Sequence, residues 1–393
     1  MGFLVKPNIK VDKIELKTDE NSKVGIANLL KSWGPAMPVV KINNYVLAAG
    51  EVESFDLNVK LNALPSFTFS INDSNYAIRR ALQKETIDKC VIFIGFSNWY
   101  IKFNGLITSC TSDAGATNIF INGILFNEKL YTSIQKSYKD LTINDILTDI
   151  AQKTNMGLFT VNNKALSNTL DYCLNSNKKY IDFFKYVIEK YTNNLWSIDP
   201  LYNFYVSDIE TLRKQKFDKY TIGESGKQHD PKDMIITSYW FNETDNFKLK
   251  ANYYSINTNF GIAHINNSID YGIFSSDSKE ASKIDSNKII GLGDDFENTF
   301  SGFKKQFFPY YDKIVNKSIA GKSITVEMEQ VLFELTPFSV VDFEVYFPKK
   351  DDEPVKKDIE NSGKKVVIGY SYHFDKKNEE NTYPKVRQSI DLI

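Results

Sequence analysis

The strongest constraint on the fold of this chain is a strict alternation of apolar and polar residues in two neighbouring segments. Apolar side chains occupy every second position at Phe55, Leu57, Val59 and Leu61, and again at Phe67, Phe69 and Ile71. A period of two places them on one face of a strand, which packs on a core while the other face meets water. Because the chain also holds 28 Phe and 22 Tyr, we expect strands to dominate.

More strand patterns lie on either side of the middle of the chain. The early ones cover 91–96, 99–103 and 118–125, and the late ones cover 324–328, 340–347, 364–374 and 386–393, with a charged hairpin loop at 349–362. The early group, with the alternating segments, predicts a small antiparallel barrel or sandwich. The opening 35 residues show no sustained period, and we interpret them as an arm.

Helical periodicity begins in the middle of the chain. Thr142 is a suitable N-cap for an amphipathic helix that ends near Gly157, and a second amphipathic pattern covers 179–191. Ser207 and Glu210 have the spacing of a capping box, which predicts a short third helix. We therefore expect an α+β block between the two strand-rich parts.

The segments around and after this block are less regular. A hairpin is predicted over 196–206, and two further paired strands are predicted at 234–240 and 247–254 around a polar turn. Residues 255–300 are rich in Asn, Ser, Asp and Gly, which predicts long loops. An interrupted helix is predicted over 303–317.

Size, charge and cysteine content narrow the class of protein. The 393 residues are too many for one typical domain, so we expect two to four. The 48 Lys plus Arg balance 49 Asp plus Glu, so net charge steers the chain toward neither nucleic acid nor an anionic membrane. Cys90, Cys110 and Cys173 fit neither a disulfide framework nor a four-ligand zinc site. We expect folding in a reducing cytosol.

No segment predicts a membrane helix or an export signal. The longest strongly apolar run, 91–96, is far short of the roughly 18 residues that a membrane helix needs. The first six residues contain no apolar core of signal-peptide length. We expect a soluble protein without a cleaved leader.

Two short strings imitate nucleotide-binding loops. Gly321-Lys322-Ser323 lacks the glycine that a phosphate loop needs five residues earlier, where Asn316 stands. In Gly223–Lys227 the required positions hold Thr221 and Gln228, and Lys227 also breaks a nucleophile-elbow pattern. Phe296 replaces the third glycine after Gly291-Leu292-Gly293. We interpret these strings as turns.

Histidines and carboxylates show no catalytic or metal-binding spacing. His229 and His264 are expected in loops and His373 in a strand, with no two near one another in sequence. The carboxylate clusters at 294–295 and 351–353, and a partial calcium-loop pattern from Asp285, are interpreted as solvated loops. We predict no catalytic, cofactor-binding or metal-binding residues, no cofactor and no enzyme activity.

Three features together resemble the hub proteins at the centre of contractile phage baseplates. They are the strand 105–108 leading to the capped helix 141–153, the helix 180–191 followed by the hairpin ending at 208, and the late strands that begin after the Leu335-Thr336-Pro337 turn. The hub module of type VI secretion spike proteins shares this architecture. The resemblance covers most of the chain.

The resemblance implies a β-rich α+β fold, in which two antiparallel barrel-like domains hold an inserted α+β region. The implied division is an N-terminal arm, a first barrel, an α+β outer domain, a discontinuous second barrel and a loop-rich continuation of the outer domain, at 1–37, 38–127, 128–231, 232–256 with 318–393, and 257–317.

The resemblance also implies partners and a location. Three copies would form a pseudo-sixfold ring that joins the sixfold tail tube to a threefold central spike. The implied partners are the spike protein, the tube protein, the tape-measure protein and baseplate wedge proteins, with DNA only as transient cargo. The location would be the virion tail baseplate, assembled in the host cytoplasm. We expect a polar lumen lined by Asn-rich and Ser-rich strand faces.

Two other functions remain open from the sequence. A tail-tip protein of a non-contractile phage would share the fold. A carbohydrate-binding or glycoside-processing β-protein would use Trp33, Trp99, Trp196 and Trp240 as stacking platforms. Because the last three lie in strand patterns, we expect them to pack in the core instead.

Overall fold

A computed structural model gives the fold. It describes the following residues: 3–5, 37–42, 45–47, 51–84, 88–96, 99–112, 115–161, 165–192, 194–215, 221–224, 234–243, 253–258, 261–266, 289–291, 322–328, 331–333, 335–347, 356–359, 361–376 and 386–393. The predicted helix over 303–317, His229, Trp33 and the carboxylate clusters at 285, 294–295 and 351–353 lie outside these residues.

A thirteen-stranded sheet is the largest element. Its strands, in spatial order, are β20 (Val340–Glu344), β14 (Thr221–Glu224), β15 (Met234–Glu243), β19 (Lys322–Met328), β22 (Arg387–Leu392), β21 (Gly363–Asp375), β4 (Val52–Val59), β5 (Ser66–Asn72), β8 (Asn118–Leu125), β7 (Trp99–Thr111), β6 (Lys89–Phe96), β2 (Met37–Ile42) and β3 (Tyr45–Leu47). The prediction that strands dominate, with large antiparallel sheets and few helices, is confirmed.

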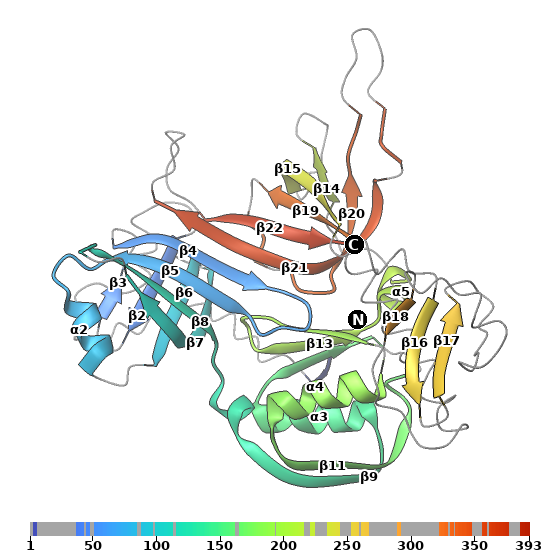
Figure 1. Cartoon of the computed structure of the whole chain (residues 1–393). Helices are drawn as coiled ribbons and strands as arrows, with labels where there is room; N and C mark the ends of the chain where they lie inside the picture. Colours follow the sequence, from blue (N-terminus) through green and yellow to red (C-terminus); the bar gives the residue numbers. More distant parts are fainter. Residues whose placement is uncertain are drawn as a thin grey trace. The chain divides into compact units, whose positions relative to one another are not determined.

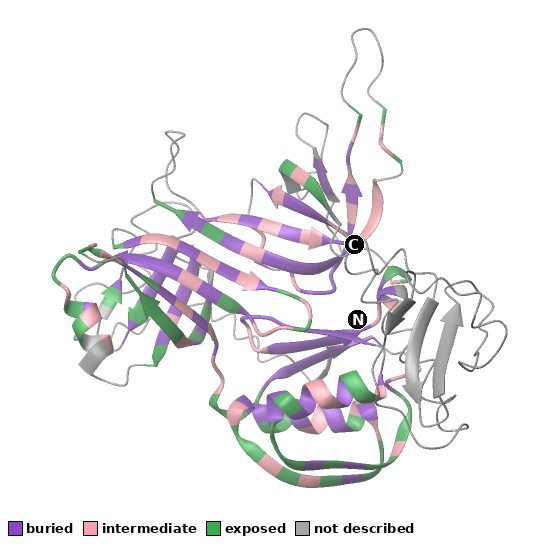
Figure 2. Ribbon diagram, in the orientation of Figure 1, coloured by how far each residue is buried: buried purple, intermediate pink, exposed green. Residues whose placement is uncertain are grey.

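Burial along these strands follows the alternation in the sequence. On β4, Val52, Phe55, Leu57 and Val59 are buried, while the residues between them are partly exposed. Figure 2 shows the same change of class along β21 and β22. The apolar face forms the core, because it packs against apolar side chains of neighbouring segments and leaves the polar face toward water.

Early and late parts of the chain meet where β4 pairs with β21. The pairing is antiparallel and runs from Tyr370 opposite Val59 to Asp375 opposite Ser54. Figure 1 shows these two strands, far apart in sequence, side by side. The long sheet is therefore continuous across the two strand groups.

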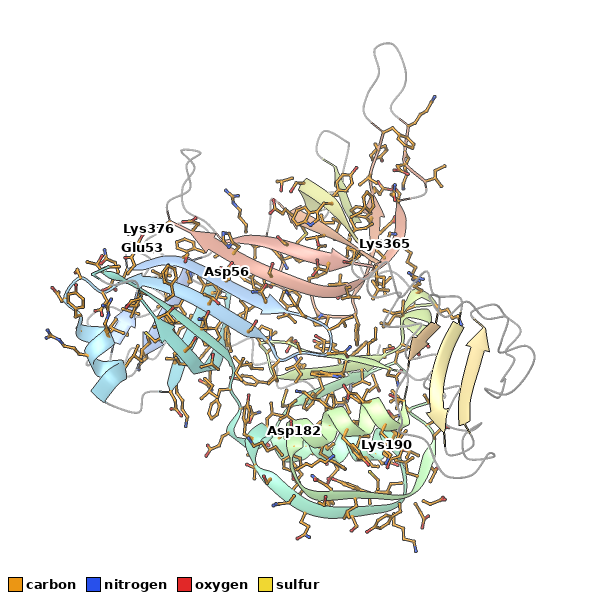
Figure 3. All side chains as sticks on the ribbon, in the orientation of Figure 1. Glu53, Asp56, Asp182, Lys190, Lys365 and Lys376 are labelled. Atoms are coloured by element: carbon orange, nitrogen blue, oxygen red, sulfur yellow. The ribbon has the colours of Figure 1, made fainter. Side chains whose placement is uncertain are left out.

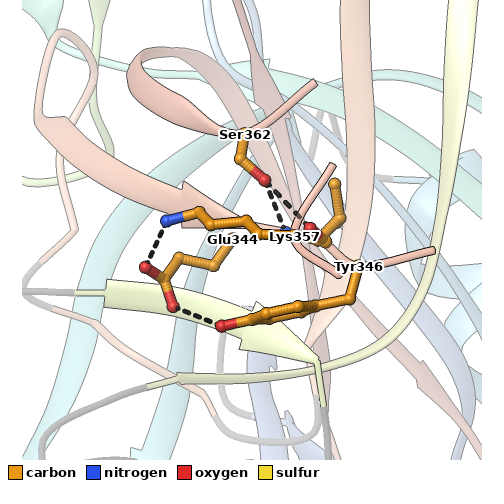
Figure 4. Close-up of polar contacts among 5 residues, drawn as sticks. Glu344, Tyr346, Lys357 and Ser362 are labelled. Atoms are coloured by element: carbon orange, nitrogen blue, oxygen red, sulfur yellow. Dashed lines mark hydrogen bonds and ion pairs between the residues drawn. The ribbon is translucent and has the colours of Figure 1, made fainter. Parts of the chain in front are cut away.

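The hairpin from β20 to β21 is held by a small polar cluster (Figure 4). Lys357 Nζ lies 2.5 Å from Glu344 Oε1, and the Tyr346 hydroxyl donates to Glu344 Oε2 at 3.3 Å. Ser362 Oγ accepts from the Val345 amide and donates to the Val345 carbonyl, both at 3.0 Å. These contacts fix the strands on either side of the predicted charged loop.

The middle of the chain forms an α+β block, as predicted. A sheet of β1 (Phe3–Val5), β10 (Gly157–Thr160), β13 (Asn203–Ser207) and β12 (Leu195–Ile198) accompanies the helices α3 (Ile143–Thr154), α4 (Tyr180–Tyr191) and α5 (Ile209–Arg213). The predicted hairpin is the β12–β13 pair. Shorter helices are α2 (Ala77–Lys84) and the 3-10 turn Glu128–Tyr131.

The helix boundaries follow from their caps. Thr142 and Asp145 form a reciprocal capping box at the start of α3, and Asn155 ends it in a left-handed conformation. At α5 the cap is Asp208 and not Ser207, since the Thr211 amide donates to Asp208 Oδ1 at 2.7 Å. The cap therefore lies one residue later than predicted, and its carboxylate accepts the Thr211 amide instead of a serine hydroxyl accepting the Glu210 amide.

A ribbon of β9 (Ser133–Thr142) and β11 (Thr169–Lys179) was not predicted. Its outward side chains include the exposed Tyr172 and Leu174, while Tyr138 and Cys173 are buried. Polar residues and lysines interrupt the alternation on both strands, so the sequence pattern of the ribbon is weak.

A separate compact unit contains Phe241–Ser323 and Tyr191–Asn193. Its described sheet consists of β17 (Gly261–Asn266), β16 (Tyr253–Thr258) and β18 (Ile289–Gly291). Of the second strand of the predicted pair, 247–254, only residues 253–254 are described; they lie in β16, which pairs with β17 and β18, while β15 lies between β14 and β19. The prediction of long loops missed the strands of this sheet.

The Phe67 ring occupies a slot between two glycines of the long sheet. A methyl group on Gly105 would lie 2.5 Å from the ring and 2.8 Å from Cys90 Sγ. A methyl group on Gly123 would lie 2.2 Å from the ring. The absence of side chains on β7 and β8 therefore creates the space that the phenylalanine fills.

We expect Gly105→Ala to lower the free energy of unfolding by about 1–3 kcal/mol, because the added methyl overpacks this slot. The urea midpoint and slope measure the loss. In a Phe67→Leu background the same change should cost less, since the obstructing ring atoms are gone. Equal costs in the two backgrounds would show that the ring is not the obstacle.

Candidate functional site

The polar face of the long sheet carries a row of hydrogen-bonding side chains across six strands. Consecutive register partners place Arg387, His373, Asp56, Thr68, Asn122 and Ser109 beside one another. His373 Nδ1 pairs with Asp56 Oδ1. Thr68 Oγ1 donates to Asn122 Oδ1 at 2.8 Å, and Asn122 Nδ2 donates to Ser109 Oγ at 2.9 Å. The row is continuous across the β4–β21 junction.

Neighbouring rows of this face are also polar. Ser54 and Ser70 hydroxyls lie 2.6 Å apart, and Lys376 Nζ lies 3.0 Å from Glu53 Oε1. Figure 3 shows Glu53 and Asp56 on β4, with Lys376 beside Glu53. Acidic and basic groups are mixed with hydroxyls and amides, so this face has no single strong charge. The face is mainly polar, although Phe120, opposite Ser70 on β8, is 43% exposed on it.

The two strand groups of the sheet repeat one topology. The first group is β4 to β8, and the second is β15 with β19 to β22. Numbered from one to five along the chain, both groups have the spatial order 3-4-5-2-1. A sixth strand lies beside strand three in each group, β2 antiparallel to β6 and β14 parallel to β20. Strand β20 also pairs with β21, so the second group's pairings return to their starting strand.

Local irregularities and polar contacts repeat along with the topology. Strand β7 has a register shift between Ile107 and Ser109, and β21 has one between Val367 and Gly369, each against the last strand of its group. The Thr68–Asn122 hydrogen bond has its counterpart in Thr325 Oγ1 donating to Asp391 Oδ1 at 2.5 Å. The repeat thus extends from strand order to individual side chains.

A buried carboxylate lies where the α+β block meets the second strand group. Asp199 accepts hydrogen bonds from the amides of Leu201 and Asn203, at 3.0 and 2.9 Å, and from the Tyr205 hydroxyl at 2.9 Å. Burial raises the pKa of Asp199 to about 6, although these hydrogen bonds act in the opposite direction. The Tyr205 ring in turn packs edge-on against Phe338.

The β12–β13 hairpin around Asp199 also contacts the first strand group. The Asn62 amide donates to the Trp196 carbonyl at 2.7 Å, and Ser197 Oγ donates to the Lys60 carbonyl at 3.3 Å. The Asn104 amide donates to the Tyr202 hydroxyl at 2.7 Å. One hairpin therefore holds both strand groups to the α+β block.

The strings and histidines considered in the sequence have structural positions. Gly223 and Glu224 lie in β14, and Lys322 and Ser323 lie in β19, so the turn interpretation is wrong for these residues. They continue the ladders of the sheet because neither string contains a proline or a glycine pair that would break a strand. His264 is in β17 and not in a loop.

The remaining candidates do not gather into one cluster. Within the described ranges, no group of three or more His, Cys, Asp and Glu residues is placed to hold a metal ion. No helix in the part of the chain that the structure describes is long and apolar enough to cross a membrane. Trp196 is buried, as predicted, but the expectation that Trp240 packs in the core is wrong, since this side chain on β15 is 43% exposed.

Comparisons with known proteins concern the fold. Neither the protein-family models nor the curated proteins searched match this sequence. The structure is similar to the 43 kDa tail protein of prophage MuSo2 from Shewanella oneidensis, with a TM-score of 0.55 and 9% identity over 91% of this chain and 96% of that chain. A tail protein from Neisseria meningitidis MC58 has a TM-score of 0.53 and 11% identity, with the same two coverages.

This chain has a phage tail protein fold. The resemblance to hub-type tail proteins is thereby confirmed at the level of the fold. The sequence predicted a polar strand face but not which strands form it. In the structure, the Ser, Thr and Asn residues between the buried positions of β4, β5 and β8 lie on one polar face of the sheet. The alternation of apolar and polar residues in the sequence marks the polar positions within each strand. Only the pairing register between the strands brings these positions together into one surface.

The buried Asp199 predicts how stability changes with pH. Its pKa is about 6 in the fold against an ordinary 3.8, so the folded state holds the proton more tightly. This contribution is complete below about pH 4 and is lost as the pH rises through 6, and two pKa units correspond to about 3 kcal/mol. The stability of the wild type relative to Asp199→Asn should therefore increase as the pH falls from 7 to 4.

Urea midpoints at several pH values measure this difference. The exposed Asp171→Asn substitution is the matched control and should leave the pH profile unchanged. The hydrogen bond to Asp56 raises the pKa of His373. The stability that His373 contributes is therefore present below pH 6.5 and is lost only as the pH rises above that value. Identical profiles for wild type and Asp199→Asn would contradict the assignment.

Proposed function

We propose that this chain is a structural hub subunit of a phage tail baseplate, three copies of which form a pseudo-sixfold ring. The observation that carries the proposal is the repeated strand topology within one chain. Two similar units per chain give a trimer six similar units, which is what a ring between a sixfold tube and a threefold spike requires. The role is structural and not enzymatic, in keeping with the tail proteins that share the fold.

In this proposal each strand group closes into a barrel-like domain. The first occupies 38–127, and the second occupies 232–256 with 318–393. The return of pairing from β21 to β20 supports closure of the second group. The arm at 1–37, the α+β domain at 128–231 and the loop-rich region at 257–317 would lie outside the barrels.

The polar face of the long sheet would line the lumen of the ring. Hydroxyl and amide side chains that bond one another across strands leave few groups to hold a passing chain. DNA or the tape-measure protein would pass as transient cargo. The tube, spike and wedge proteins would be the neighbours, in a baseplate assembled in the host cytoplasm.

Light scattering and negative-stain imaging test the ring directly. We expect a mass three times that of the chain, and rings with threefold symmetry and a central hole, for the chain alone or after mixing with its tail neighbours. The three copies need large contact areas to be stable, which a lone binding module lacks. A chain that remains monomeric under both conditions contradicts the proposal.

A charge test examines the lumen. Ser66→Arg with Ser109→Arg adds two cations per chain on the polar face, and we expect the native particle to assemble but to release DNA about tenfold more slowly at low salt. High salt should restore the rate by screening. Ser133→Arg with Ser176→Arg, on the exposed side of the β9–β11 ribbon, is the control. An equal effect from the control, or none from the test pair, would place the lumen elsewhere.

A further inference from the structure

Within the chain, the two strand groups are joined by pairing between an edge of one group and an edge of the other. The strands that correspond to these two edges occur once more, one in each group. Internally, strand one of the first group, β4, pairs with strand four of the second group, β21. The corresponding strands are β15, which is strand one of the second group, and β7, which is strand four of the first. We propose that β15 of one copy pairs with β7 of the next copy. This inference rests on the proposed ring and specifies its contact between subunits.

The internal pairing shows what such a seam buries. Tyr370 and Val59 are opposite one another and are 4% and 0% exposed. On the polar face, His373 pairs with Asp56, and the Lys376 amide donates to the Glu53 carbonyl at 2.9 Å. A seam of this type therefore combines an apolar side, a polar side and main-chain hydrogen bonds.

The part of β7 beyond Ile107 corresponds to the part of β21 that pairs with β4. Strand β6 pairs with β7 from Trp99 to Leu106, and the Ile107 amide donates to the Asp88 carbonyl. Beyond Ile107, no described strand other than β8 pairs with β7. Aligning the register shifts of the two strands makes Cys110 the counterpart of Tyr370. Tyr370, which lies opposite Val59 in the internal seam, is buried, whereas Cys110 is exposed.

The complementary edge is the second part of β15. Strand β14 pairs with β15 from Met234 to Ile236, and no other described strand pairs with the rest of this edge of β15. Ser238 Oγ donates to Glu327 Oε2 at 2.8 Å, in the place where Ser54 meets Ser70 in the first group. Thr237, Ser238 and Trp240 are exposed. A neighbour on this edge would cover Trp240, which is 43% exposed in the single chain.

The internal register also predicts the register between copies. Ser238 corresponds to Ser54, so position 243 corresponds to Val59, and Cys110 corresponds to Tyr370. Since Tyr370 lies opposite Val59, Cys110 should lie opposite Glu243 of the neighbouring copy. The contact is head-to-tail, and such contacts close into a ring when the rotation permits. Three internal seams would then alternate with three between copies.

The thiols of the chain offer a direct test. Cys90 and Cys173 are buried, and Cys110 is exposed on β7. Directly opposed residues of antiparallel strands have Cβ atoms about 5 Å apart, which a disulfide or a short bismaleimide can bridge. We expect Glu243→Cys, oxidised in the assembled ring, to give covalent dimers and trimers on a non-reducing gel. Cys110→Ser in the Glu243→Cys background should abolish them, and Asp140→Cys, on the ribbon, should give none.

A second variant tests the proposed β15–β7 contact without a cross-link. Cys110→Glu places a charge on the covered edge and should raise the dissociation constant of the ring at least tenfold, while Cys110→Ala should leave it nearly unchanged. The seam would be overturned, and the ring proposal left intact, by two results together: rings form normally with Cys110→Glu, and rings that keep Cys110 give no cross-link to a cysteine placed at any position from 240 to 243. A chain that forms no ring under any condition would overturn both.

Discussion

The pairing of β4 with β21 is the interaction on which the rest of the structure depends. It joins segments more than 300 residues apart in sequence, as its His373–Asp56 contact shows. Without it the chain would hold two separate strand groups, each with an open edge. With it, the polar side chains of both groups form one continuous face. Its contacts are mostly main-chain hydrogen bonds and buried apolar pairs, which require register and not a particular sequence motif.

The β12–β13 hairpin supports this junction from the α+β block. Trp196 and Tyr202 bond to the first strand group, and Tyr205 packs on Phe338 near the second. Asp199 organises the turn between the two strands by accepting amides from Leu201 and Asn203. A carboxylate with four donors around it tolerates burial far better than an unpaired one, although its raised pKa shows that part of the desolvation cost remains.

Sequence patterns predicted the elements with strong local signals. The alternation at 55–71 gave β4 and β5, and the Thr142 cap with its apolar stripe gave α3. The predictions missed elements whose local sequence signal is weak, such as the lysine-rich β9–β11 ribbon. They also missed strands that contain a glycine, such as Thr221–Glu224. The described partners of β15, which are β14 and β19, were not predicted, because they lie elsewhere in the chain and pairing with distant segments leaves no local signal.

The sequence by itself determined which residues face inward, since a period of two or of 3.6 separates apolar from polar positions within each element. It also determined the helix starts, because caps act over three or four residues. Only the tertiary structure decided that two strand groups share one topology and that their polar sides form one surface. Strand partners such as Tyr370 and Val59 are chosen by distant main-chain hydrogen bonds, which leave no local trace in the sequence.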